Sequence, residues 1–199
     1  TTGSAFVANA TAGFEIAYKY ANLQPGDEVI VPAITFIATM AYPLSVGAKL
    51  VFADLDPRTC NMDPKDVERK ITPKTKAIMV VHYVSYPCDM DAIMAIAKKH
   101  NLYVTEDVSH AQGGLYKGRK LGTFGDVAAM SMMSGKSFAA GELGMLVTDD
   151  RKIYERAMAF AHYERNNEKY IQESDDLKPY YHIALGGIKG RANQLCTAL

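Results

Sequence analysis

Apolar and amphipathic segments alternate along most of the chain. Continuous apolar runs predict strands that are buried on both faces, because a strand with one wet face alternates apolar and polar residues. These runs lie at residues 29–31, 49–53, 77–81, 102–105, 127–132 and 145–148. Segments with apolar residues at helical spacing lie between or beside them, at 9–20, 35–46, 64–70, 89–100 and 151–163. The alternation predicts an α/β protein with a three-layer architecture, a mostly parallel sheet with helices on both faces.

Turn-forming residues punctuate this pattern. QPGDEV (24–29) is turn chemistry ahead of a strand, and Pro64 suits the first residue of a helix. The segment LYKGRKLG (115–122) predicts a hairpin or a polar excursion. The polar stretch 164–178 fits either a mobile loop or an interface arm, and the sequence leaves both open.

Both ends of the chain lie inside regular patterns. The chain begins in TTGSAFVANATAGFEIAYKY, without a Met and directly in an apolar helical pattern. It closes on QLCTAL, within another helical pattern and without a stop signal. We therefore expect a fragment of a longer protein, truncated at both ends.

Charge and cysteine content narrow the class of protein. Lys and Arg together number 22, as do Asp and Glu, so there is no overall basic footprint for nucleic acid. The three cysteines are far apart and form no CxxC pair, which argues against a disulfide framework or a structural zinc site. No apolar run approaches the ~20 residues of a membrane helix. We expect a cytoplasmic protein that binds neither nucleic acid, membrane nor metal.

One lysine stands apart from other charged residues. The segment DVAAMSMMSGKSFAAGELGMLVT (126–148) predicts strand, tight turn, lysine, Gly-rich loop and strand. Lys136 is the only basic residue between Lys120 and Arg151. Desolvation favours the free amine of a lysine, which Schiff-base chemistry requires. Taken alone, a loop lysine is more often a surface residue.

Three further features supply what a pyridoxal phosphate site needs. The helix start at 9–12 offers backbone N–H groups to an anion, Asp107 follows a predicted strand, and Ser131 precedes Lys136. A lysine binds the cofactor, a carboxylate keeps its pyridine nitrogen protonated, and hydroxyl and helix N–H groups bind its phosphate. Taken singly, the helix start and Asp107 are more often explained by helix capping, and Ser131 by a turn. The glycines form no GxGxxG, so a dinucleotide site is not expected.

At these residues the chain resembles the DegT/DnrJ/EryC1/StrS aminotransferases, fold-type-I pyridoxal phosphate enzymes that act mainly on keto-sugars. Six blocks in family order carry the resemblance. They are PGDEVIVPAITFIAT (25–39), VGAKLVFADLDPRTCNMDP (46–64), ITPKTKAIMVVH (71–82), DMDAIMAIAKKHNLYVTEDVSHAQGGLYKGRKLGTFGDVA (89–128), SMMSGKSFAAGELGMLVTDD (131–150) and GGIKGRANQL (186–195). The resemblance implies that residues 1–199 are the cofactor-binding large domain, with a C-terminal small domain missing.

The resemblance also implies roles around the cofactor ring. Lys136 corresponds to the lysine that forms a Schiff base with the cofactor and shuttles the proton. Asp107 corresponds to the partner of the pyridine nitrogen. Ser109 and Phe36 correspond to the residues on the two ring faces. His110 stands where Gln is common in the family, next to the phenolic oxygen of the cofactor. An imidazole there would make the electronic properties of the cofactor ring depend on pH.

The phosphate is expected to bind at the start of the first helix and across a subunit interface. Thr11, the amides of Ala10 and Ala12, and the Ser131 hydroxyl correspond to the phosphate ligands. The family usually has Ser-Gly-Thr where this chain has Asn-Ala-Thr at 9–11. Lys189 or Arg191 would reach the phosphate of a partner subunit, which implies a homodimer; both residues also suit a plain polar turn.

The activity implied is transfer of an amino group from glutamate or glutamine to a keto-sugar or keto-cyclitol, nucleotide-linked in some cases. A sugar dehydratase of the same family is a weaker alternative, because those enzymes have a histidine where this chain has Lys136. A non-catalytic protein with the same fold, used in regulation or assembly, is the alternative from another class.

His82, at a strand end, and the methionines at 130, 132 and 133 are interpreted as structural residues.

Overall fold

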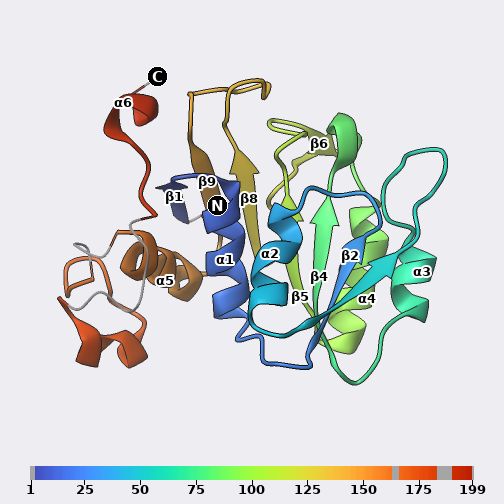
Figure 1. The fold of residues 1–199 in the computed structure, drawn as a ribbon, viewed down its shortest axis with the longest axis horizontal. Coiled ribbons are helices and arrows are strands. Elements are labelled where there is room, and N and C mark those ends of the chain that lie inside the picture. The colour runs from blue at the N-terminus through green and yellow to red at the C-terminus, as the bar shows by residue number, and fades with distance from the viewer. Residues whose placement is uncertain (1–2, 163–165, 183–189, 199) are drawn as a thin grey trace.

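A sheet of seven strands forms the centre of the computed structural model, which describes residues 3–162, 166–182 and 190–198 (Figure 1). In sheet order its strands are β1 (Gly3–Val7), β9 (Gly144–Thr148), β8 (Val127–Ser131), β5 (Tyr103–Asp107), β4 (Thr75–Val81), β2 (Glu28–Pro32) and β3 (Lys49–Ala53). Strands β8, β5, β4, β2 and β3 pair in parallel, whereas β9 is antiparallel to both of its neighbours. The predicted mostly parallel sheet is confirmed.

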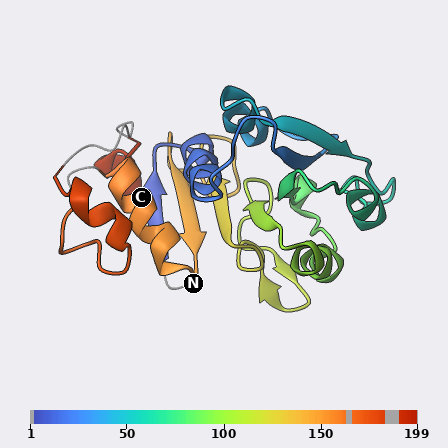
Figure 2. The ribbon, with the colours of Figure 1, turned by 90° about the horizontal axis from the view of Figure 1, so that it is seen from below.

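Helices cover both faces of this sheet, as Figure 2 shows along the strands. One face carries α1 (Ala10–Tyr20), α2 (Ala38–Ser45) and α5 (Arg151–Ala161), which pack on the sheet through two apolar clusters. The other carries α3 (Pro64–Arg69), α4 (Met90–His100) and the hairpin of β6 (Leu115–Tyr116) and β7 (Arg119–Lys120). Short helical turns complete the described elements: η1 (Tyr83–Ser85), η3 (Asp175–Tyr180) and α6 (Gln194–Thr197). The three-layer prediction is therefore confirmed as well.

Local sequence explains where the helices begin and end. Asp89 caps α4 by accepting the Ala92 amide at 3.2 Å, and the last turn of the helix carries Lys98, Lys99 and His100. Acceptors at the start and cations at the end of a helix both complement its dipole. Asn101 then adopts a left-handed conformation (φ 53°) that stops the helix before β5.

Two glycines bring α1 unusually close to the sheet. A Cβ on Gly13 would lie 2.7 Å from Cβ of Ala129 on β8. A Cβ on Gly144, the first residue of β9, would lie 2.3 Å from the carbonyl carbon of Asn9. Because neither position tolerates a side chain in this arrangement, these glycines fix the N-terminus of α1 against the ends of β8 and β9.

The structure differs from the sequence expectation at two places. Residues 3–7 form β1 rather than the start of a helical pattern, because they pair with the antiparallel edge of β9. Helix α2 begins at Ala38 and not at residue 35, because Thr39 turns its amide and hydroxyl back to the Phe36 carbonyl (3.2 and 2.9 Å). The polar stretch after α5, for which the sequence leaves a mobile loop and an interface arm open, is bonded to that helix where described, since the buried Glu155 carboxylate accepts the amides of residues 172–174.

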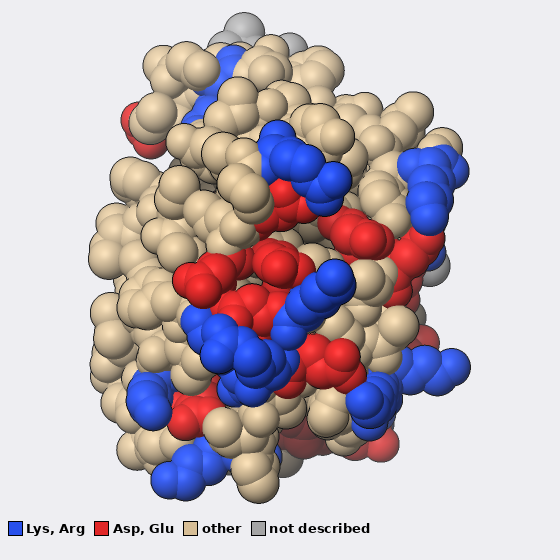
Figure 3. Space-filling view, turned by 90° about the vertical axis from the view of Figure 1, so that its right-hand side faces the viewer, with Lys and Arg blue, Asp and Glu red and all other residues tan. Residues whose placement is uncertain are grey.

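Charged side chains of both signs are interspersed on the face that includes α3 and α4 (Figure 3). Several are paired: Asp66 with Arg69 and Lys70, and Glu68 with Lys99. This face therefore offers no single-sign surface to nucleic acid. Within the described parts of the chain, no helix has the length and apolar character needed to cross a membrane.

Candidate active site

A cleft of about 430 Å³ opens where β4, β5 and β8 end and α1 begins. In parallel sheets, ligands bind at this edge. Eight of the residues predicted for the site line the cleft: Ala10, Thr11, Phe36, Asp107, Ser109, His110, Ser131 and Lys136. Ala12 is buried and does not line the cleft, and Lys189 lies outside the described residues. The fold thus brings together side chains that are more than 120 positions apart in the sequence, as Thr11 and Lys136 are.

Asp107 is a buried carboxylate at the floor of the cleft. It ends β5, is 6% exposed, and its Oδ1 accepts the Ser109 amide at 2.9 Å. Burial raises the pKa of Asp107 above its usual value, although hydrogen bonds from Ser109 and the charges of His110 and Lys136 lower it. No described cation lies within ion-pair distance of it. A buried carboxylate with no ion-pair partner fits a cationic ring nitrogen, which would lower its desolvation cost.

Hydrogen bonds tie the ends of β5 and β8 together. The Ser131 amide donates to Oγ of Ser109 at 2.9 Å, and Oγ of Ser131 accepts the Met133 amide at 3.3 Å. The Ser109 amide in turn donates to Asp107. The hydroxyls of Ser109 and Ser131 therefore fix the spacing between Asp107 and the segment that leads to Lys136.

Lys136 lies near the tip of a closed loop between β8 and β9. The neck of this loop is formed by hydrogen bonds from the Ser134 amide to the Gly141 carbonyl (2.9 Å) and from the Ala140 amide to the Met132 carbonyl (2.8 Å). Gly135 supplies the left-handed turn before the lysine (φ 96°). Lys136 is half-buried whereas its sequence neighbours are exposed, which directs it into the cleft that it lines.

The start of α1 presents the backbone donors of its first turn to the same cleft. Oδ1 of Asn9 accepts the Ala12 amide at 3.0 Å and so caps the helix. The amides of Ala10 and Thr11 have no intrahelical acceptor, because they belong to the first turn. Together with the hydroxyls of Thr11 and Ser131, they fit a phosphate group. The Ala12 amide, in contrast, is already bonded to Asn9 in this arrangement.

Sequence reasoning did not select Tyr83 or Glu142, which also line the cleft. Tyr83 follows the end of β4, so the strand-end rule that selected Asp107 would also have found it. Its ring lies 5.9 Å from the His110 ring, at a 49° angle. The next two residues, Val84 and Ser85, both have positive φ (48° and 65°), and Oγ of Ser85 donates to the His110 carbonyl at 2.5 Å. Such strained backbone beside a cleft is typical of functional sites.

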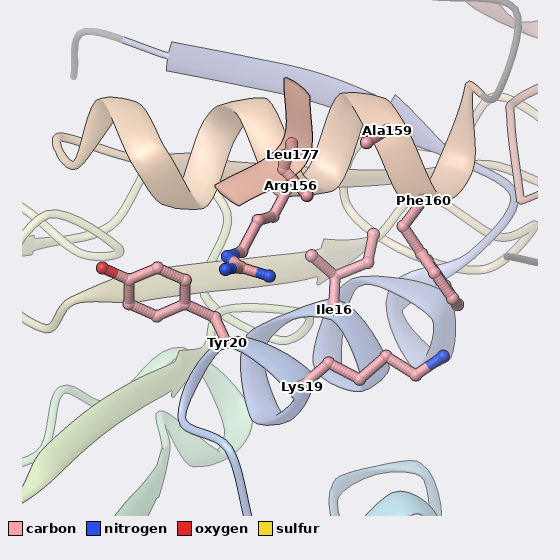
Figure 4. Close-up of a pocket in the computed structure, with 7 residues that line it drawn as sticks. All are labelled: Ile16, Lys19, Tyr20, Arg156, Ala159, Phe160 and Leu177. Carbon is pink, nitrogen blue, oxygen red and sulfur yellow. The ribbon is translucent and has the colours of Figure 1, made fainter. Parts of the chain in front are cut away.

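A second hollow, of about 200 Å³, lies at the opposite end of α1, between that helix and α5 (Figure 4). Its two cationic side chains already have partners. Lys19 pairs with Glu15 at 3.2 Å and lies 3.7 Å from the centre of the Phe160 ring, and Arg156 pairs with Asp176. None of the residues predicted for catalysis or cofactor binding lines this hollow.

The chain is similar to known aminotransferases in both sequence and fold. The sequence profile of the DegT/DnrJ/EryC1/StrS aminotransferase family matches residues 3–199. The chain is 44% identical over 154 residues to the GDP-perosamine synthase of Escherichia coli O157:H7, covering 77% of this chain and 42% of that protein. The solved aminotransferase from Psychrobacter cryohalolentis has a TM-score of 0.88 at 35% identity, covering 98% of this chain and 50% of that one.

A protein from Streptococcus pneumoniae solved in its PLP form gives a TM-score of 0.84 at 26% identity, covering 98% of this chain and 53% of that one. The chain spans about half the length of the curated relatives it matches.

Proposed function

Because the chain belongs to the DegT/DnrJ/EryC1/StrS aminotransferase family, we propose that the full-length protein is a pyridoxal-phosphate-dependent aminotransferase that acts on a keto-sugar or keto-cyclitol. The amino donor is glutamate or glutamine. The observation that carries the proposal is the meeting of Lys136, Asp107 and the start of α1 in one cleft. Residues 1–199 are then the large domain, and a C-terminal small domain lies outside this sequence.

Lys136 and Asp107 have complementary tasks in this proposal. Bound pyridoxal phosphate supplies an aldehyde carbon that bonds to amines and a ring that withdraws electrons from the substrate carbon. Nζ of Lys136 is the cleft-lining amine that holds the cofactor covalently, and it also moves the proton at the substrate carbon. The Asp107 carboxylate keeps the ring nitrogen protonated, a role favoured by its burial and by the lack of an ion-pair partner among the described residues.

The remaining cleft residues orient the cofactor. The amides of Ala10 and Thr11 and the hydroxyls of Thr11 and Ser131 bind the phosphate. Phe36 and Ser109 lie at the two ring faces, and His110 is adjacent to the phenolic oxygen. These roles are supported by the positions of the side chains along the cleft wall. The Ala12 amide joins the phosphate site only if Asn9 releases it.

The proposed substrate class follows the relatives. The Escherichia coli relative is a GDP-perosamine synthase, so a nucleotide-linked keto-sugar is the acceptor that we propose to test first.

We also propose a cytoplasmic homodimer in which Lys189 or Arg191 of one subunit reaches the phosphate bound by the other. The homodimer is supported by the exposed apolar side chains at the rim of the cleft, where Phe36 is 72% exposed and Ile37 is 56% exposed. A second copy of the chain would cover these side chains.

The decisive test is reduction of the full-length protein with borohydride after addition of pyridoxal phosphate, followed by peptide mapping. We expect the reduced adduct on Lys136 in the wild type and in the exposed control Lys120→Ala, and no such adduct in Lys136→Ala. An adduct elsewhere would contradict the assignment.

In a separate sample that has not been reduced, and without any acceptor, added glutamate should yield one equivalent of 2-oxoglutarate per site, or added glutamine one equivalent of 2-oxoglutaramate. Covalent binding of the cofactor with neither keto acid formed would favour the regulatory alternative. Release of a dehydrated sugar without amino transfer would favour the dehydratase.

A further inference from the structure

The side chain of Gln112 joins two segments of the candidate site. Its Nε2 donates to the Ser131 carbonyl at 2.6 Å and to the Phe138 carbonyl at 3.4 Å. Its Oε1 accepts the Phe138 amide at 2.7 Å. Gln112 follows the strand that ends in Asp107, whereas Ser131 and Phe138 flank Lys136. One amide group therefore connects the Asp107 segment to both sides of the lysine loop.

Residues 135–139, the outer part of the loop that carries Lys136, form few other hydrogen bonds among the described residues. Among the described residues, the hydrogen bonds of residues 135–139 are those to Gln112 and one from the Lys136 amide to the Met133 carbonyl (3.1 Å). The Phe138 side chain is 60% exposed, so packing does not fix it either. The bonds at the neck of the loop lie below this region. Gln112 is thus the side chain that anchors the tip beyond Lys136.

We propose that Gln112 is a positioning residue that sets the approach of Lys136 to the cofactor, an inference that rests on the role proposed above for Lys136. A primary amide is suited to this task because it donates and accepts at the same time. An ionised carboxylate has no donor for the Ser131 carbonyl, and a thioether has none at all. Productive geometry for covalent chemistry requires placement of the amine to within a fraction of an ångström.

The first arm of the test is hydrogen exchange of the full-length protein without cofactor. In Gln112→Met, which keeps the length of the side chain, the peptide containing Phe138 should exchange roughly tenfold faster than in the wild type. Peptides from α4 and β4 should be unchanged, which shows that the variant is folded. Gln24→Met is the matched control, because Gln24 also bonds backbone oxygen, at 3.2 Å, but in a remote turn. Unchanged exchange at Phe138 would overturn the proposal.

A second variant separates hydrogen bonding from shape. In Gln112→Glu the ionised carboxylate accepts from Phe138 but repels the Ser131 carbonyl, whereas the protonated acid donates and accepts as the amide does. Protection of the loop should therefore recover as the pH falls below the usual Glu pKa of about 4.3. The wild type, corrected for intrinsic exchange rates, should show no such recovery. A Glu variant without pH dependence would contradict the proposed bonding.

The last arm compares the rate at which borohydride traps pyridoxal phosphate on Lys136. We expect slower trapping in Gln112→Met than in the wild type and in Gln24→Met. Faster exchange with unchanged trapping would overturn the positioning role. If the wild type itself forms no adduct on Lys136, the proposed function fails, and the exchange experiment alone decides whether Gln112 holds the loop.

Discussion

His82 and Glu106 form a hydrogen-bonded pair that is completely buried, with Nε2 of His82 3.1 Å from Oε2 of Glu106. Nδ1 of His82 accepts the Cys88 amide at 3.2 Å, so the ring proton is on Nε2 and is donated to the carboxylate. Glu106 precedes Asp107 on β5. Because side chains alternate along a strand, Glu106 faces away from the cleft while Asp107 faces into it. The pair thus anchors the strand that carries the candidate site.

The first prediction concerns this anchor. Glu106 also accepts the amides of Gly122, Phe124 and Gly125 at 2.7–2.8 Å. In Glu106→Gln the new NH₂ group faces N–H donors, so buried donors lose their acceptor. We expect a loss of about 3 kcal/mol in the free energy of unfolding, measured by urea denaturation.

Glu68→Gln, which breaks an exposed pair with Lys99, should leave the free energy of unfolding nearly unchanged. Equal costs for the two substitutions would contradict the anchoring role of Glu106.

The second prediction concerns the contact between Gly144 and Asn9. In Gly144→Ala the new methyl group would lie 2.3 Å from a backbone atom, so α1 must move away from β9. We expect a loss of about 2 kcal/mol in stability and weaker binding of pyridoxal phosphate, because the phosphate donors move with the helix. Gly118→Ala is the control: it places the same methyl group in open space at a φ of 82°, costs about 1 kcal/mol, and should leave cofactor affinity unchanged.

The third prediction concerns the pH dependence of stability. Burial raises the pKa of Asp66, but hydrogen bonds from Lys70, the Asp54 amide and Arg69 lower it more, to about 2. A carboxyl group whose pKa is depressed by folding stabilises the protein above its unfolded pKa, and this stabilisation is lost as the pH falls through the folded value. Unfolding free energy should therefore decline between about pH 4 and pH 2. In Asp66→Asn the decline should be shallower; an identical slope would refute this origin.

The alternation of apolar and amphipathic segments was sufficient to predict the layers of the fold. Long-range pairing was not predictable in the same way. β1 was missed because Gly3–Val7 is a strand only through its register with β9, a partner about 140 residues away in the sequence. Helix α2 was predicted to start early because apolar periodicity continues into 35–37, whereas the Phe36 carbonyl is engaged by Thr39.

The site was predictable to the extent that its residues carry a local signal. Asp107 follows a strand and Lys136 is isolated in charge, so both were selected from the sequence, and both line the cleft. Gln112 was not, because a Gln before two glycines has no distinctive pattern. Its significance depends on Ser131 and Phe138, which only the folded chain brings within hydrogen-bond distance.

The last prediction is that the charge of Asp107 destabilises the protein without cofactor and stabilises it when the cofactor is bound. Its raised pKa means that the ionised carboxylate destabilises the cofactor-free fold above the unfolded pKa, whereas below that pH the group is protonated in both states and has no such effect. Asp107→Asn keeps an acceptor for the Ser109 amide and removes the buried charge. Without cofactor, this variant should be more stable than the wild type by about 1 kcal/mol at neutral pH, with the difference shrinking on acidification.

With pyridoxal phosphate the order should reverse, because the wild-type carboxylate gains a cationic partner and the amide does not. Thermal melts of both proteins, with and without cofactor, measure this directly. Asp91→Asn, on the exposed side of α4, is the matched control. It should neither raise the melting temperature without cofactor nor lower it with cofactor. If Asp107→Asn is destabilised without cofactor and unaffected with it, Asp107 is a structural residue and not the partner of the ring nitrogen.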